Sequence, residues 1–127
     1  MKESEQFRKG VVLFNARKYF EAHEVWEELW LVEPEPEKTF LQGLIQVAAA
    51  CLHDSRGNMS GTQSLLAAGL AKLRRFPDDH RGISLAQLRA ETEKWAVVSS
   101  TGNEPGAREA PRIRMATAAR QKKKRGG

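Results

Sequence analysis

The chain has 127 residues, of which 40% are apolar and 29% are charged, and this size and composition suit one globular domain rather than two. Its single cysteine, Cys51, excludes an internal disulfide, and we expect it to pack in the core of a protein from a reducing compartment. The first residues lack the apolar core of a signal peptide, and no apolar run of about 18 residues occurs. We therefore expect a soluble, cytoplasmic protein with no membrane contact.

The net charge of +5 is concentrated at the end of the chain. Residues 104–127 hold eight Arg and Lys against two Glu, whereas residues 1–103 hold thirteen basic residues against fourteen acidic ones. The end segment has little apolar content and closes with the cluster "KKKR", which is typical of disorder. We expect a helical domain over residues 1–101 and a flexible basic tail over residues 102–127. This tail either makes weak, non-specific contacts with nucleic acid or another anionic partner, or only keeps the protein soluble.

The first predicted helix carries Phe7, Val11 and Phe14 at helical spacing and ends near Asn15. A second helix is predicted from about Lys18 to Val32. It stops there because the segment "EPEPE" follows, and its two prolines cannot continue a helix.

Pro36 can open a third helix that contains "TFLQGLIQVAAACLHD" and ends at "SRGN". This helix is apolar on almost every side, which predicts a central, buried position. Ser60 and Gln63 have the spacing of a capping box at the start of a fourth helix, and Ser84 and Gln87 have it at the start of a fifth. Strand patterns are absent. The sequence therefore predicts an all-α fold, a compact bundle of about five helices with short loops.

Within the second helix, the stretch "EAHEVWEELW" mixes ionisable and aromatic side chains. At about 100° per residue, His23 and Glu27 fall in the middle of the apolar arc and Glu24 falls at its border. Glu21 and Glu28 fall on the side that should meet water. The pattern predicts that His23 and Glu27 are buried.

The third helix offers partners for such buried groups. Gln42, Gln46 and His53 fall on one narrow stripe of this otherwise apolar helix, and amide and imidazole groups can hydrogen-bond to buried polar atoms. The short connection between the two helices favours antiparallel neighbours. We therefore expect one polar cluster between them, which consists of His23, Glu24, Glu27, Gln42, Gln46 and His53.

This cluster is open to four interpretations. His23 and Glu27 have the spacing of a helical metal-ligand pair, and His53 could complete a three-ligand site for a divalent metal, with Glu24 orienting a ligand or acting as a catalytic base. A small molecule could instead occupy a pocket lined by His23, Glu24, Trp26, Glu27, Trp30, Gln42, Gln46 and His53. The cluster could equally be a non-catalytic network that fixes helix register, or part of a partner-binding surface. The indoles of Trp26 and Trp30 could be core side chains or could form a platform for a ligand.

Three runs, "LFNARKYFEAHEVWEELW", "FLQGLIQVAAACLH" and "GNMSGTQSLL", together resemble a bacterial and archaeal family known as domain of unknown function 309, over roughly residues 7–90. The resemblance implies a small all-α domain and carries no established activity. The family's motifs fall here on Phe20, His23, Glu24, Trp26, Glu27, Trp30, Gln42, Gly43, Gln46 and His53. The segment after about Thr101 lies outside the resemblance.

Two further features carry less chemistry. The run "HEVWE" lacks the second histidine of the zinc-protease motif H-E-x-x-H, so a peptidase is unsupported. His80 lies in "FPDDHRG", where turn-forming residues explain it without a chemical role.

Overall fold

The computed structural model describes residues 2–100 and 110–116. Its elements are α1 (Lys2–Asn15), α2 (Tyr19–Val32), α3 (Glu37–Ser55), α4 (Met59–Leu73), the short 3-10 turn η1 (His80–Gly82) and α5 (Leu85–Ser100). Within these described ranges the only β-type pairing is an isolated antiparallel bridge between Ile83 and Met115. The predicted all-α bundle of five helices is confirmed.

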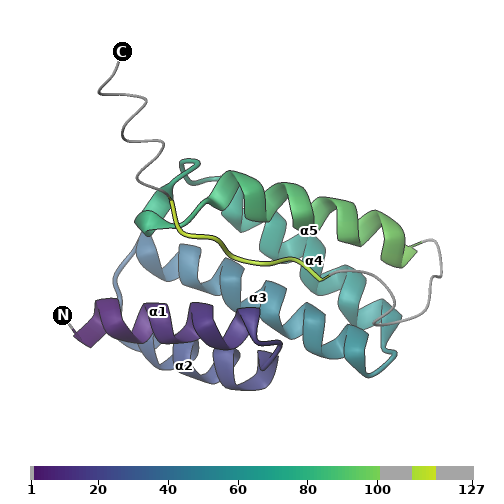
Figure 1. Ribbon diagram of the computed structural model, residues 1–127, viewed down its shortest axis with the longest axis horizontal. Helices are drawn as coiled ribbons and strands as arrows, with labels where there is room; N and C mark the ends of the chain where they lie inside the picture. Colours follow the sequence, from purple (N-terminus) through teal and green to yellow (C-terminus); the bar gives the residue numbers. More distant parts are fainter. Residues whose placement is uncertain (1, 101–109, 117–127) are drawn as a thin grey trace, which may run out of the picture.

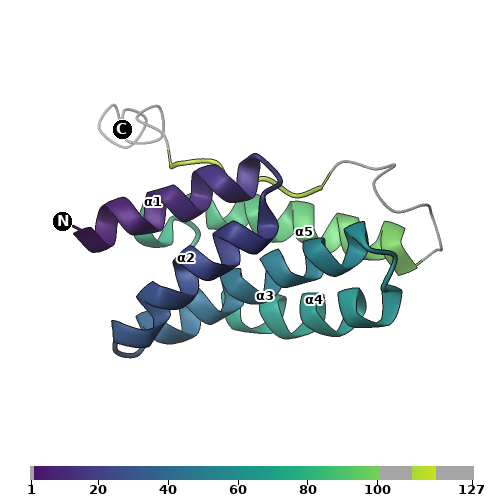
Figure 2. The same ribbon diagram turned by 90° about the horizontal axis from the view of Figure 1, so that it is seen from below.

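The helices form two layers, with α3 in the centre of one of them. Helix α3 packs against α2 on one side and α4 on the other, and α1 and α5 lie over this layer (Figures 1 and 2). Residues 110–116, which we call the strap, run in the seam between α1 and α5. Among the described helices, none combines the length and the apolar character needed to cross a membrane.

The contact between α1 and α2 depends on a glycine facing an indole. Trp26 is fully buried, and its Nε1 donates a hydrogen bond of 3.2 Å to the carbonyl of Phe7. Gly10 lies so close to this ring that a Cβ atom there would be 2.1 Å from Nε1. Trp26 is therefore a core side chain and cannot serve as a ligand platform.

Helices α3 and α4 also approach closely at glycines. A Cβ atom on Gly43 would lie 2.8 Å from Cδ2 of Leu73, and one on Gly69 would lie 3.0 Å from the carbonyl oxygen of Gly43. Small residues at both positions bring the two backbones together. Gly43, one of the motif residues quoted from the sequence, thus permits the close contact between α3 and α4.

The start of α4 differs from the prediction. Asn58 is its N-cap, and the side chain of Asn58 accepts a hydrogen bond of 3.1 Å from the Gly61 amide. Ser60 therefore lies inside the helix, and the capping box predicted from Ser60 and Gln63 is wrong. The carboxamide of Asn58 reaches the first turn and starts the helix earlier. Helix α5, in contrast, begins directly after Ser84, as predicted.

The strap lies where the sequence predicts a flexible tail. Ile113 is only 2% exposed, and Asn15 holds its main chain with two hydrogen bonds of 2.8 Å, one from Asn15 Nδ2 to the Ile113 carbonyl and one from the Ile113 amide to Asn15 Oδ1. The Ser84 amide donates to the Arg114 carbonyl. Residues 110–116 thus depart from the expectation of a tail without structure, whereas residues 101–109 and 117–127 lie outside the described part of the chain.

Candidate functional site

The outward side of α2 is more apolar than the prediction allowed. The side chains of this helix that are buried are Tyr19, Ala22, Trp26 and Leu29. Phe20 and Leu31, in contrast, are 51% and 66% exposed, and Glu27 between them is exposed as well. The prediction that Glu27 is buried is therefore wrong. Within the described residues, the main contacts of α2 are with α1 and α3, and these leave Phe20 and Leu31 uncovered.

His23 lies at the edge between the covered and the uncovered side of α2. It is half-buried, and its ring stacks on Phe20 with 6.4 Å between the ring centroids. Its Nδ1 atom is buried and has no hydrogen-bond partner in the structure. Glu24, predicted at the rim, is exposed.

The polar stripe predicted on α3 does not join His23 in a network. Gln42 and Gln46 are half-buried, and the buried Oε1 of Gln46 has no hydrogen-bond partner. His53 instead accepts a hydrogen bond of 3.0 Å at Nδ1 from the Nδ2 group of Asn58, the residue that caps α4. His53 therefore supports a helix start.

The predicted metal ligands are not gathered. Across residues 2–100 and 110–116, no group of three or more His, Cys, Asp and Glu side chains is placed to hold a metal ion. Glu27 points outward, His23 lies at a helix edge, and His53 is bound to Asn58. Because Gln46 and His23 leave polar atoms unpaired, the register network also lacks the hydrogen bonds that it requires.

Trp30 differs from Trp26 in its surroundings. Trp30 is half-buried, and Lys38 at the start of α3 lies with its Nζ 4.0 Å from the ring centroid and donates to the Trp30 carbonyl. The indole Nε1 of Trp30 is buried without a hydrogen-bond partner. Trp30 therefore packs against the core with part of its ring still accessible on the open face of α2.

Four side chains form a continuous line on that open face, which we call the α2 stripe: Phe20, Glu24, Glu27 and Leu31. They fall within about 60° of one another on the helix, and all four are exposed. Helix α2 contains four Glu and no Lys or Arg. In the described part of the chain, neither Glu24 nor Glu27 has an ion-pair partner. The stripe is thus apolar at both ends and carries uncompensated negative charge between them.

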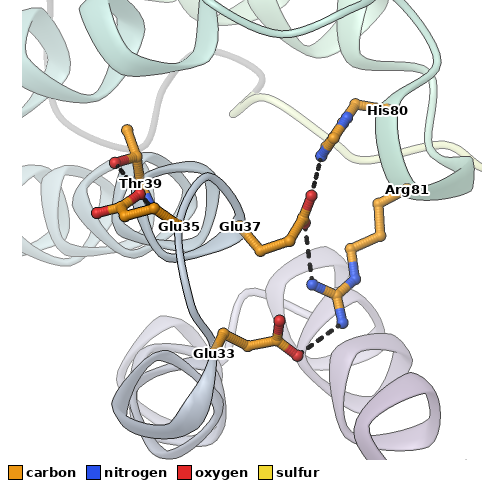
Figure 3. A network of polar contacts seen from close by, with 6 residues as sticks. All are labelled: Glu33, Glu35, Glu37, Thr39, His80 and Arg81. Atoms are coloured by element: carbon orange, nitrogen blue, oxygen red, sulfur yellow. Dashed lines mark hydrogen bonds and ion pairs between the residues drawn. The ribbon is translucent and has the colours of Figure 1, made fainter.

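A charged network lies where the α2–α3 connection meets η1 (Figure 3). Glu37 contacts His80 at 2.8 Å through one carboxylate oxygen and Arg81 at 3.1 Å through the other. The second guanidinium nitrogen of Arg81 lies 3.5 Å from a carboxylate oxygen of Glu33. All four side chains are less than a third exposed, so solvent screens these charges only in part.

Aromatic rings enclose this network. The His80 ring packs against Phe40 and Phe76, with centroids 4.6 and 4.8 Å away, and the Arg81 guanidinium lies 4.9 Å from the Phe7 ring centroid. Arg81 has a φ of 57°, a backbone conformation that residues other than glycine rarely adopt. The sequence interpretation of His80 as a simple turn residue missed this network. The four-residue spacing of Glu33 and Glu37 was the available signal that the two carboxylates lie close together. The prolines between them interrupt the helical pattern that would have made this signal recognisable.

The same connection contains a smaller hydrogen-bonded group, also drawn in Figure 3. The hydroxyl and the amide of Thr39 both donate to one carboxylate oxygen of Glu35, at 2.6 and 3.1 Å. The hydroxyl bond to Thr39 holds the pKa of Glu35 below its ordinary value. Glu35 thereby shares the Thr39 amide, in the first turn of α3, with the Pro36 carbonyl.

A cavity of about 180 Å³ lies beside the start of α2, and Tyr19, Cys51, Asp54 and Trp95 are among its lining residues. Burial raises the pKa of the Tyr19 phenol well above its usual range, and the nearby Cys51 thiol adds to this. Cys51 is 2% exposed, so its predicted place in the core is confirmed. Ala110 of the strap closes part of this cavity.

Residues 7–65 match a family model described as "Domain of unknown function (DUF309)". The resemblance noted in the sequence is confirmed. The DUF309 segment begins within α1 and ends within α4, so it contains the whole α2 stripe. The turn η1, helix α5 and the strap lie outside it, so the matched region is shorter than the resemblance over roughly residues 7–90 predicts.

Two relatives have related sequences. An uncharacterized protein of Aquifex aeolicus (strain VF5) is 30% identical over 105 residues, which are 82% of this chain and 32% of the relative. The uncharacterized protein YpuF of Bacillus subtilis (strain 168) is 37% identical over 75 residues, which are 58% of this chain and 41% of that protein. The chain therefore spans about a third and two fifths of the lengths of these relatives.

The predicted contact of the basic tail with nucleic acid stays a prediction. Most of residues 104–127 lie outside the described part of the chain. Within the strap, the guanidinium of Arg114 forms an ion pair with Glu91, so that cation is engaged inside the molecule.

Proposed function

We propose that this protein is a non-catalytic interaction module whose α2 stripe binds a basic, amphipathic segment of a partner protein. The observation that carries this proposal is the exposure of Phe20 and Leu31 on either side of the unpaired Glu24 and Glu27. An apolar residue at either end would anchor the partner by burial. The two carboxylates would select lysine or arginine beside its apolar face.

The interior of the protein favours binding over catalysis at this face. Trp26 and the other buried side chains of α2 hold the helix rigidly against α1 and α3, so the stripe is presented on a fixed scaffold. Preorganisation of this kind lowers the entropy lost on binding. The relatives support a modular role, because in each of them the matching region is only part of a longer chain.

The proposal can be tested with a synthetic helical peptide that carries leucines on one face and lysines along its flanks. We expect this peptide to bind the full chain, with NMR shift changes concentrated on α2. The substitution Leu31→Ser should weaken binding about tenfold or more, because burying a leucine contributes about 1.5–3 kcal/mol. Glu27→Lys should weaken it further at low salt, since it reverses the charge that faces the lysines.

Val12 provides a matched control, because it is 66% exposed like Leu31 but lies on α1, outside the stripe. Val12→Ser should leave peptide binding unchanged. A second peptide with glutamates in place of the lysines should bind much more weakly than the first. Equal effects of Leu31→Ser and Val12→Ser, or equal binding of the two peptides, would show that the α2 stripe is not a specific site.

A further inference from the structure

The strap is bound in the way that a receptor binds an extended peptide. Asn15 pairs with both the amide and the carbonyl of Ile113, as a neighbouring β-strand would. On the other side of the strap, the Ser84 amide donates to the Arg114 carbonyl at 2.6 Å and the Ala116 amide donates to the Gly82 carbonyl at 2.8 Å. These bonds hold the main chain and do not depend on the side chains of the strap.

Over residues 111–114, the side chains of the strap alternate between the protein and solvent. Pro111 and Ile113 are buried, whereas Arg112, Arg114 and Met115 are exposed. This alternation is typical of a peptide in which main-chain bonds supply affinity and every second side chain enters a pocket. The seat of the strap therefore selects a proline and an aliphatic residue two positions later.

Glu91 adds a charge preference to this seat. One of its carboxylate oxygens accepts a hydrogen bond of 3.0 Å from the Arg112 amide, and the other pairs with the Arg114 guanidinium. A basic residue directly after the buried aliphatic one is thus favoured, and an acidic one is disfavoured.

We propose that the seat formed by Asn15, residues 82–84 and Glu91 is a recognition site for an extended segment of another protein. The preferred pattern would be proline, any residue, an aliphatic residue and a basic residue. In this structure the chain's own strap is the built-in occupant. The strap lies in the seam between α1 and α5, where main-chain hydrogen bonds, two buried side chains and the Arg114–Glu91 ion pair hold it, and a segment of the same pattern can make the same contacts and compete for the seat.

The test uses the full chain and a fluorescent synthetic peptide with the sequence of residues 110–116. Ile113→Asp in the protein should release the strap, because it would place a charge in an apolar pocket. The released seat should bind the peptide at least about tenfold more tightly than the wild-type chain does, since the strap no longer competes. The same peptide carrying Ile113→Asp should not bind, and Glu91→Lys in the released protein should weaken binding.

Met115→Asp is the matched control, because Met115 is 41% exposed and its change should leave the strap bound and peptide affinity at the wild-type level. If Ile113→Asp prevents folding, Arg114→Glu offers a milder release through repulsion by Glu91. A folded, released variant that binds the peptide no better than the wild type would overturn the proposal. So would a wild-type chain that only exchanges straps between two copies, seen as a concentration-dependent dimer that the peptide does not dissociate.

Discussion

Two buried threonines show that the contribution of a hydroxyl group to stability depends on whether it has a hydrogen-bond partner. Thr62 and Thr92 are both 0% exposed. The Thr62 hydroxyl donates to the Asn58 carbonyl at 2.8 Å, whereas the Thr92 hydroxyl has no hydrogen-bond partner in the structure. An unpaired polar group in the core opposes folding, and a paired one is close to neutral or favourable.

This pair gives a test by substitution with the similarly shaped valine. Thr62→Val should lower the free energy of unfolding by about 1 kcal/mol, because it removes a hydrogen bond and leaves the Asn58 carbonyl with one partner fewer. Thr92→Val should leave stability unchanged or raise it by up to about 1 kcal/mol. Urea unfolding followed by circular dichroism measures both. A loss of stability in Thr92→Val as large as in Thr62→Val would contradict the assignment of an unpaired hydroxyl.

Individual residues also show the limit of what the sequence predicts about the site. The helical projection correctly separated Trp26, which is in the core, from Glu21 and Glu28, which are exposed. It placed Glu27 inside because it treated every apolar residue of α2 as buried. Which part of an apolar arc is covered depends on where the neighbouring helices lie, and the sequence of a single helix does not contain that information.

At the scale of elements, sequence signals for helix ends were more reliable than those for helix faces. Prolines and the serine before α5 gave boundaries close to those observed, because they act through local backbone geometry. Asn58 shows the exception, since two capping residues lay within reach of the same helix start. The close approach of α1 to α2 at Gly10 was not predictable, because it depends on an indole from another helix.

Gly10→Ala tests that close approach, because we expect it to lower the stability of the protein although alanine has the higher helix propensity. In an exposed helix the change would stabilise by about 1 kcal/mol. Here the new Cβ atom would collide with the rigid ring of Trp26, so we expect a loss of about 2 kcal/mol in the free energy of unfolding. Lys9→Ala, at the exposed neighbouring position, should change stability by less than about 0.5 kcal/mol. A stabilised Gly10→Ala variant would show that α1 and α2 are less tightly packed than the structure indicates.

Across the molecule as a whole, contacts between residues far apart in the sequence could not be predicted from sequence patterns. The network of Glu33, Glu37, His80 and Arg81 joins the α2–α3 connection to the turn before α5. Neither segment has a periodic pattern, and their pairing follows only from the way the helices stack. The strap was missed for the same reason, since one isoleucine among basic residues carries no local signal.

Glu37→Gln measures what this network contributes. Glutamine would leave the half-buried Arg81 and His80 without their shared carboxylate, so we expect a loss of about 1–3 kcal/mol at neutral pH. Glu93→Gln is the matched control, because its partner Arg74 is 54% exposed and Glu93 itself is 49% exposed. That change should cost less than about 0.5 kcal/mol. Equal losses in the two variants, measured by chemical denaturation, would indicate that the network is as well screened as a surface ion pair.

The hydrogen bonds between Asn15 and Ile113 have a consequence for the order of folding during synthesis. Apart from them, the main helix contacts join neighbours in the sequence, from α1 with α2 to α4 with α5, and such local contacts form quickly. Asn15 and Ile113 are 98 residues apart. A chain that emerges from the ribosome can therefore build its helical body first, with the seam between α1 and α5 vacant until residues 110–116 arrive. During that interval the nascent chain would be open to other extended segments.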